Sequence, residues 1–106
     1  MSAIERKSGE KMILQEDCAE DKLRNGILTL TNRRLIFEKT EGKMVLLSKK
    51  TGEAVLDISL DKISSVKTEG VLIKKVTIIV DHTVYKFGVF NNSKWAKAIE
   101  KQKMTT

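Results

Sequence analysis

The sequence has very little of what metal and catalytic sites are made from. It contains one cysteine, Cys18, and one histidine, His82. An internal disulfide is therefore excluded, and zinc would lack the second and third ligands that it needs. Neither a Gly-x-Ser-x-Gly motif nor a phosphate-binding glycine loop is present. We expect no enzyme activity, no bound metal and no cofactor.

Long apolar runs are missing as well. The longest, Met44 to Leu47 and Val76 to Val80, fall far short of the roughly 20 residues that a membrane-spanning helix needs. The first seven residues mix charges and no apolar segment follows them, so they do not form a signal peptide. We expect a cytoplasmic protein that does not cross a membrane but could bind peripherally to one.

Aromatic residues make up only 5% of the 106 residues, whereas 32% are charged, and the net charge is +6. The length suits one domain. We assign residues 1–9 to a flexible N-terminal arm and 10–106 to the single domain. The positive charge favours anionic partners, although a solvated surface explains most of the basic residues equally well. The low aromatic content and the lack of a reading helix argue against nucleic acid.

Apolar and polar residues alternate through most of the chain, which indicates half-buried strands. The acidic stretch from Glu16 to Asp21 shows no such pattern, and Asn25-Gly26 is a typical turn dipeptide, so we expect the first loop there. The expected strands are 11–15, the two arms of a hairpin over 26–37, 54–60, 63–67, 73–81 and 83–90, with a turn at Asp81-His82.

The period changes at the C-terminal end. Asn91, Asn92 and Ser93 can cap a helix, after which Trp95 and Ile99 fall on one helical face with Ala98 and Gln102. We expect Trp95 to be a core residue rather than a ligand-stacking one. The expected structural core is Leu28, Leu30, Leu35, Phe37, Leu56, Ile58, Leu60, Trp95 and Ile99.

Strands followed by one helix predict a mainly β, antiparallel α+β domain and exclude a parallel α/β fold. Three segments, Gly26–Phe37, Ile58–Val66 and Phe90–Ile99, resemble those of GRAM and bacterial pleckstrin-homology-like (PH-like) domains. The resemblance extends from about residue 11 to 104. It implies about seven antiparallel strands in two near-orthogonal sheets, capped by one C-terminal helix, with binding through loops at the open end.

Two groups of basic residues are candidate anion or lipid sites. Arg33 and Arg34 could clamp a phosphate, because guanidinium offers paired donors; alternatively they are solvated, pair with a carboxylate or stabilise the hairpin corner. The second group surrounds the apolar run 44–47, as in loops that lean on anionic membranes. That run could instead be an additional strand whose lysines keep an edge soluble. The second group is Lys39, Lys43, Lys49 and Lys50.

The resemblance implies a non-catalytic binding module. Phosphoinositide-binding members gather basic residues around the first loop, but here this loop is acidic, from Glu16 to Asp21. We therefore favour a protein or peptide partner, added as a strand at a sheet edge or held between the helix and the sheet. The alternative is peripheral binding to anionic phospholipid through residues 39–50. A homo-oligomer formed through an edge strand stays open.

Overall fold

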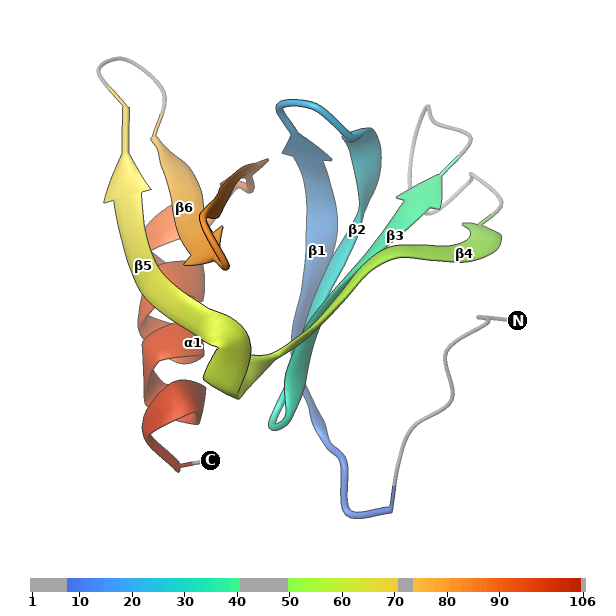
Figure 1. Ribbon diagram of the computed structural model, residues 1–106. Coiled ribbons are helices and arrows are strands. Elements are labelled where there is room, and N and C mark those ends of the chain that lie inside the picture. Colours follow the sequence, from blue (N-terminus) through green and yellow to red (C-terminus); the bar gives the residue numbers. More distant parts are fainter. Residues whose placement is uncertain (1–7, 41–49, 71–73, 106) are drawn as a thin grey trace.

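Seven antiparallel strands and one long helix make up the part of the chain that the computed structural model describes, residues 8–40, 50–70 and 74–105 (Figure 1). The mainly β fold with a C-terminal helix agrees with the expectation from the sequence. In chain order the elements are β1 (Met12–Glu20), β2 (Arg24–Thr31), β3 (Arg34–Thr40), β4 (Lys50–Ser59), the 3-10 turn η1 (Leu60–Lys62), β5 (Ile63–Glu69), β6 (Lys75–Val80), β7 (Thr83–Gly88) and α1 (Asn92–Thr105).

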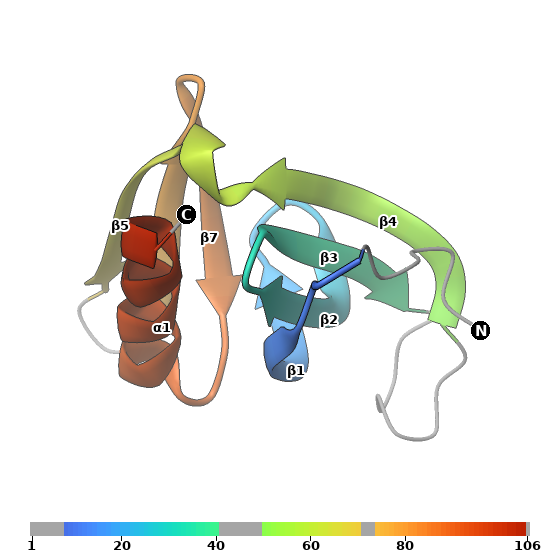
Figure 2. The same ribbon diagram turned by 90° about the horizontal axis from the view of Figure 1, so that it is seen from below.

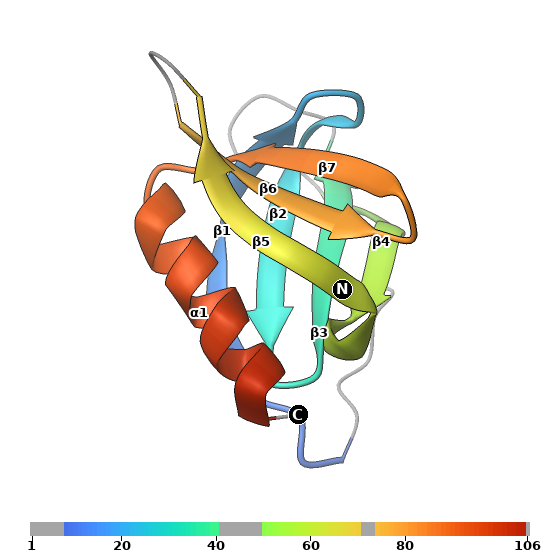
Figure 3. The same cartoon turned by 60° about the vertical axis from the view of Figure 1, so that its left-hand side comes forward.

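The strands form one sheet in the order β4-β3-β2-β1-β7-β6-β5. The halves β1–β4 and β5–β7 cross each other, as Figure 3 shows. They are joined on one side by the turn η1 and on the other by only two residue pairs between β1 and β7, Ala19 with Gly88 and Glu20 with Phe87. The two sheets that the resemblance implies are thus the two halves of one bent sheet.

Helix α1 closes one side of this bent sheet, packed against β5, β6 and η1 (Figure 2). Trp95 and Ile99 are buried and Ala98 is partly buried in the core. These are the residues that the helical period places on one face. The burial of this stripe, rather than its intrinsic propensity, stabilises a helix of 14 residues.

The core lies between the two halves and the helix. Phe37 from β3 and Phe87 from β7 meet there, with ring centroids 6.0 Å apart. Of the nine residues expected in the core, eight are buried and Leu56 is partly buried against the cluster. The buried eight are Leu28, Leu30, Leu35, Phe37, Ile58, Leu60, Trp95 and Ile99.

The acidic stretch is strand, which corrects the expected loop. β1 continues through residues 16–20 and pairs with β2 along this length. Glu16, Cys18 and Glu20 turn inward in alternation with exposed residues. Glu20 accepts a hydrogen bond from a backbone N–H group of β7, and Glu16 accepts one from the segment between β7 and α1. Period-two burial is present, but polar residues with distant partners carry it, so hydrophobicity did not reveal it.

Asn25-Gly26 is not the first turn, although this dipeptide predicts one. The turn falls at residues 21–23, and Gly26 is a buried strand residue paired with Cys18 and Lys39. A Cβ on Gly26 would collide with the Phe37 ring and lie 2.5 Å from the carbonyl oxygen of Glu38. Glycine is therefore required here by close approach of the next strand.

The turn at Asp81-His82 is where the sequence places it. Val80 pairs with Thr83, which leaves a two-residue connection between β6 and β7. Asp81 has a φ of 52° and His82 a φ of 69°. Two successive positive φ values are typical of the tight turns that match the twist of a hairpin. His82 is therefore an exposed turn residue.

Candidate functional site

Arg34 is buried, 7% exposed, on the face of β3 that points away from the core. Its Nε lies 2.8 Å and its Nη2 3.1 Å from the two carboxylate oxygens of Glu10, and its Nη1 lies 2.8 Å from Asp57 Oδ2. Thr31 Oγ1 donates a further hydrogen bond to Glu10. The hydrogen bond with Glu10 is the main cause that raises the pKa of Arg34, against the opposing effect of burial.

Arg33 has a different environment from its neighbour. It is exposed at the corner between β2 and β3, where its backbone N–H donates to Thr31 Oγ1. The Arg34 guanidinium already binds two carboxylates, while Arg33 faces solvent. The pairing of Arg34 with carboxylates matches the alternative interpretation of this residue, and the phosphate clamp stays a prediction.

The basic group of residues 39–50 lies largely outside the described residues. Lys39 is exposed near the end of β3, and the backbone of Lys50 begins β4 and pairs with Thr40. Lys43, Lys49 and the apolar run between them fall within residues 41–49, which the structure does not describe. The expected membrane-binding loop stays a prediction.

Glu20 ties the β1–β2 turn to the other half of the sheet. It is 3% exposed; Oε1 accepts hydrogen bonds from the backbone N–H of Lys22 and of Leu23, and Oε2 accepts one from Lys86. The N–H of Asp21 also donates to the carbonyl of Lys86. Both oxygens of this buried carboxylate therefore have hydrogen-bond donors, and Glu20 has a structural role.

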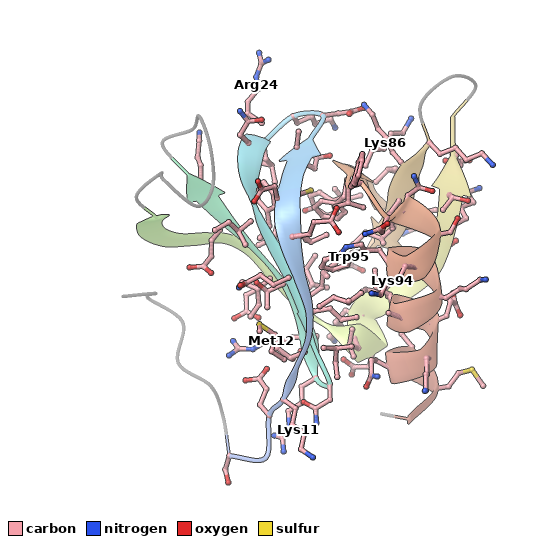
Figure 4. All side chains as sticks on the ribbon, turned by 180° about the vertical axis from the view of Figure 1, so that it is seen from behind. Lys11, Met12, Arg24, Lys86, Lys94 and Trp95 are labelled. Carbon is pink, nitrogen blue, oxygen red and sulfur yellow. The ribbon has the colours of Figure 1, made fainter. Side chains whose placement is uncertain are left out.

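Glu16 connects β1 to the start of the helix in a similar way. Its Oε1 lies 3.0 Å from the indole Nε1 of Trp95, and its Oε2 accepts hydrogen bonds from the backbone N–H groups of Phe90 and Asn91. Figure 4 shows Trp95 and Lys94 between α1 and β1, on the side of β1 that faces the helix. One carboxylate therefore fixes the position of the segment that leads into α1 relative to β1.

Beside this contact, β1 has an unpaired backbone edge. β1 pairs with β2 along its length but with β7 only at Ala19 and Glu20, so between Met12 and Cys18 it has one partner strand among the described residues. The end strands β4 and β5 also have one partner each in the described sheet. Backbone N–H and C=O groups along such edges can pair with an added strand.

Three exposed apolar side chains lie near the free part of β1, a grouping that the sequence pattern does not predict. Phe90 is 93% exposed, directly before the helix, and its N–H contacts Glu16. Met12 and Ile13 are 46% and 37% exposed at the beginning of β1. The pairing with β2 is irregular between Met12 and Leu14, which explains why two successive side chains both face solvent.

Within the described ranges, no group of three His, Cys, Asp or Glu residues could hold a metal ion. Cys18 is buried; burial, followed by the negative charges of Glu20 and Glu16, raises its pKa well above the ordinary value of 9.0. No helix among the described residues has the length and apolar character required to span a membrane.

The fold is that of known PH domains. The chain is 17% identical to the N-terminal PH domain of Vps36, with a TM-score of 0.68, over 93% of this chain and 83% of that one. It is 14% identical to the C-terminal domain of an unknown protein from Leishmania infantum, with a TM-score of 0.71, over 92% and 87% of the two chains. No curated protein matches the sequence.

A family model described as "Bacterial PH domain" matches residues 7–103. The match spans every described strand and nearly all of the helix. PH-like domains are generally binding modules without catalytic activity. The chain belongs to the bacterial PH domain family.

Proposed function

We propose that this protein is a peptide-binding module, which takes an extended segment of a partner protein as an additional strand of its sheet. The observation that carries the proposal is the set of unpaired strand edges in the described chain, on β4, on β5 and along β1 from Met12 to Cys18. Main-chain hydrogen bonds along such an edge supply affinity, while side-chain contacts supply specificity.

Ion pairs of two cations, one at the β2–β3 corner and one beside the β1–β2 turn, support a protein partner over an inositol phosphate. The Arg34 guanidinium is bound to Glu10 and Asp57. Lys75, at the start of β6, is bound to Asp21 in the β1–β2 turn. A multiply charged headgroup needs several converging cations, and neighbouring carboxylates oppose it. We also infer from the Gly26–Phe37 hairpin that the chain belongs to the GRAM-like branch of PH-like domains.

Selection of random short peptides, displayed on phage, against the immobilised full chain tests the proposal. We expect enrichment of peptides that bind the free chain in solution and compete with one another. In parallel, the chain is sedimented with vesicles of phosphatidylcholine alone or mixed with phosphatidylserine. Salt-sensitive binding to the anionic vesicles, with no peptide enriched, would favour the lipid alternative and contradict the proposal.

Cytoplasmic location and a homo-oligomer formed through an edge strand stay predictions. Sedimentation equilibrium tests the second one directly. A dimer that dissociates when a lysine is placed on the end strand β4 would indicate that a second copy occupies this edge. A monomer at all concentrations would leave the edge to other partners.

A further inference from the structure

We infer that the peptide site is the free edge of β1 beside α1, and that its ligand is a short extended segment with apolar side chains at its ends and an acidic side chain between them. This inference rests on the proposed function and specifies its place. Three edges are available in the described sheet, but the exposed apolar side chains, the hydrogen bonds of Glu16 and the charge of Lys94 favour β1 over β4 and β5.

The first observation is the distribution of exposed apolar side chains. Of the five large hydrophobic residues that are exposed in the described chain, Met12 and Ile13 lie at one end of the free edge and Phe90 at the other. The N–H of Phe90 donates to Glu16, four residues along β1 from Met12, which places its backbone beside the strand. Surface apolar residues gathered at both ends of an unpaired edge are typical of a binding site.

The second observation is that this edge is held rigidly. Glu16 accepts hydrogen bonds from Trp95 Nε1 and from the N–H groups of Phe90 and Asn91, so the segment carrying Phe90 is tied to β1. Trp95 is itself buried. A preformed site spares the ligand the free energy of ordering the protein.

The third observation is the charge beside the edge. Lys94 is exposed and lies between α1 and β1 in Figure 4; among the described residues it has no ion-pair partner. Lys97 continues the same exposed side of the helix, three residues on. The Glu16 carboxylate is already bound to three N–H donors, and alternation directs Asp17 to the opposite face of the sheet. An acidic ligand side chain opposite Lys94 is therefore complementary.

The dimensions set the length of the ligand. From Met12 to Glu16 the strand rises by roughly 13 Å, at about 3.3 Å per residue. A segment of about five residues spans this distance when extended. Its end side chains then reach Met12 and Ile13 at one end and Phe90 at the other. It adds to the sheet at the place where β7 leaves β1.

Variants of the full chain test the site with peptides selected from the random library. We expect enriched peptides to contain an acidic residue flanked by apolar ones. Ile13→Lys, Phe90→Ser and Lys94→Glu should each raise the Kd at least about tenfold. Val84→Ser and Met104→Ser, which change exposed apolar residues elsewhere, should leave the Kd unchanged. Thermal midpoints equal to that of the parent exclude unfolding as the cause.

Amide resonances of the isotope-labelled chain locate the peptide independently. We expect shifts confined to Met12–Asp17 and Phe90–Lys94. Peptides that bind unchanged to the three variants, with shifts along β4 or β5, would overturn this inference but leave the proposed function intact. If the library yields no peptide, both fail. Phosphatidylserine vesicles that shift Phe90 to Lys94 when no peptide does would make this surface a membrane contact and also overturn the inference.

Discussion

Glu10 and Arg34 are 24 residues apart in sequence, and their side chains form a doubly hydrogen-bonded ion pair that is buried away from the main core. The side chain of Glu10 has no exposed surface and that of Arg34 is 8% exposed. Thr31 and Asp57 complete the network, so residues before β1 and from β2, β3 and β4 meet at one ion pair. The hairpin corner is thus fixed by charge as well as by packing.

Replacing Arg34 with methionine should strongly destabilise the fold. The Glu10 carboxylate would stay buried without its cation, a change that typically costs about 3–5 kcal/mol. Urea denaturation followed by circular dichroism measures the free energy of unfolding. Arg33→Met is the matched control, since Arg33 is exposed, and should change it by less than about 0.5 kcal/mol. Equal effects of the two substitutions would contradict the structural role assigned to Arg34.

Gly26→Ala should destabilise the β1–β2–β3 region, because the new methyl group has no space beside the Phe37 ring and the Glu38 carbonyl. Overpacking of this kind costs about 1–3 kcal/mol. Thermal unfolding of the variant measures the loss. Asn25→Ala, at the exposed neighbouring position, is the control and should have a small effect. A Gly26→Ala variant as stable as the parent would show that β3 can move away from β2 at no cost.

The sequence predicts the strands, the helix and the core because these depend on apolar periodicity. Leu28, Leu30 and Phe37 are apolar residues at period two, so their burial follows directly. The pattern did not predict the C-terminal part of β1, because its inward residues, Glu16 and Glu20, are polar and their partners lie roughly 70 residues away in the chain. Phe90 looked like the end of a strand; its exposure depends on where β7 leaves β1, which no local pattern reports.

Cys18 should make stability depend on pH in the alkaline range. Burial and the nearby carboxylates of Glu20 and Glu16 raise the pKa of the folded thiol above 9.0, near which the unfolded thiol ionises. The stabilisation that comes from keeping this thiol neutral and buried is fully present below about pH 9.0. Above that pH the unfolded thiol ionises while the folded one does not, so the free energy of unfolding falls by about 1.4 kcal/mol per pH unit. The measured quantity is the difference in unfolding free energy between the parent and Cys18→Ala, at about pH 7 and about pH 10. A difference that is the same at both values would contradict burial of this thiol.

The contact between Glu16 and Trp95 should contribute separately from the burial of the indole ring. Trp95→Ala should lose about 3–5 kcal/mol, mostly from the cavity left in the core, whereas Trp95→Phe keeps much of the ring and removes the N–H donor. Glu16→Ala removes the acceptor of three donors and should cost about 1–3 kcal/mol.

A double-mutant cycle with Glu16→Ala and Trp95→Phe isolates the pair. We expect a coupling free energy of about 0.5–3 kcal/mol, because the two side chains are in direct contact. Asp17→Ala paired with Trp95→Phe is the control and should show additivity, since alternation along β1 directs Asp17 away from the helix. If the Glu16 and Trp95 substitutions prove additive, the segment before α1 is held by ring packing alone, and the rigid edge that we assign to β1 loses its main support.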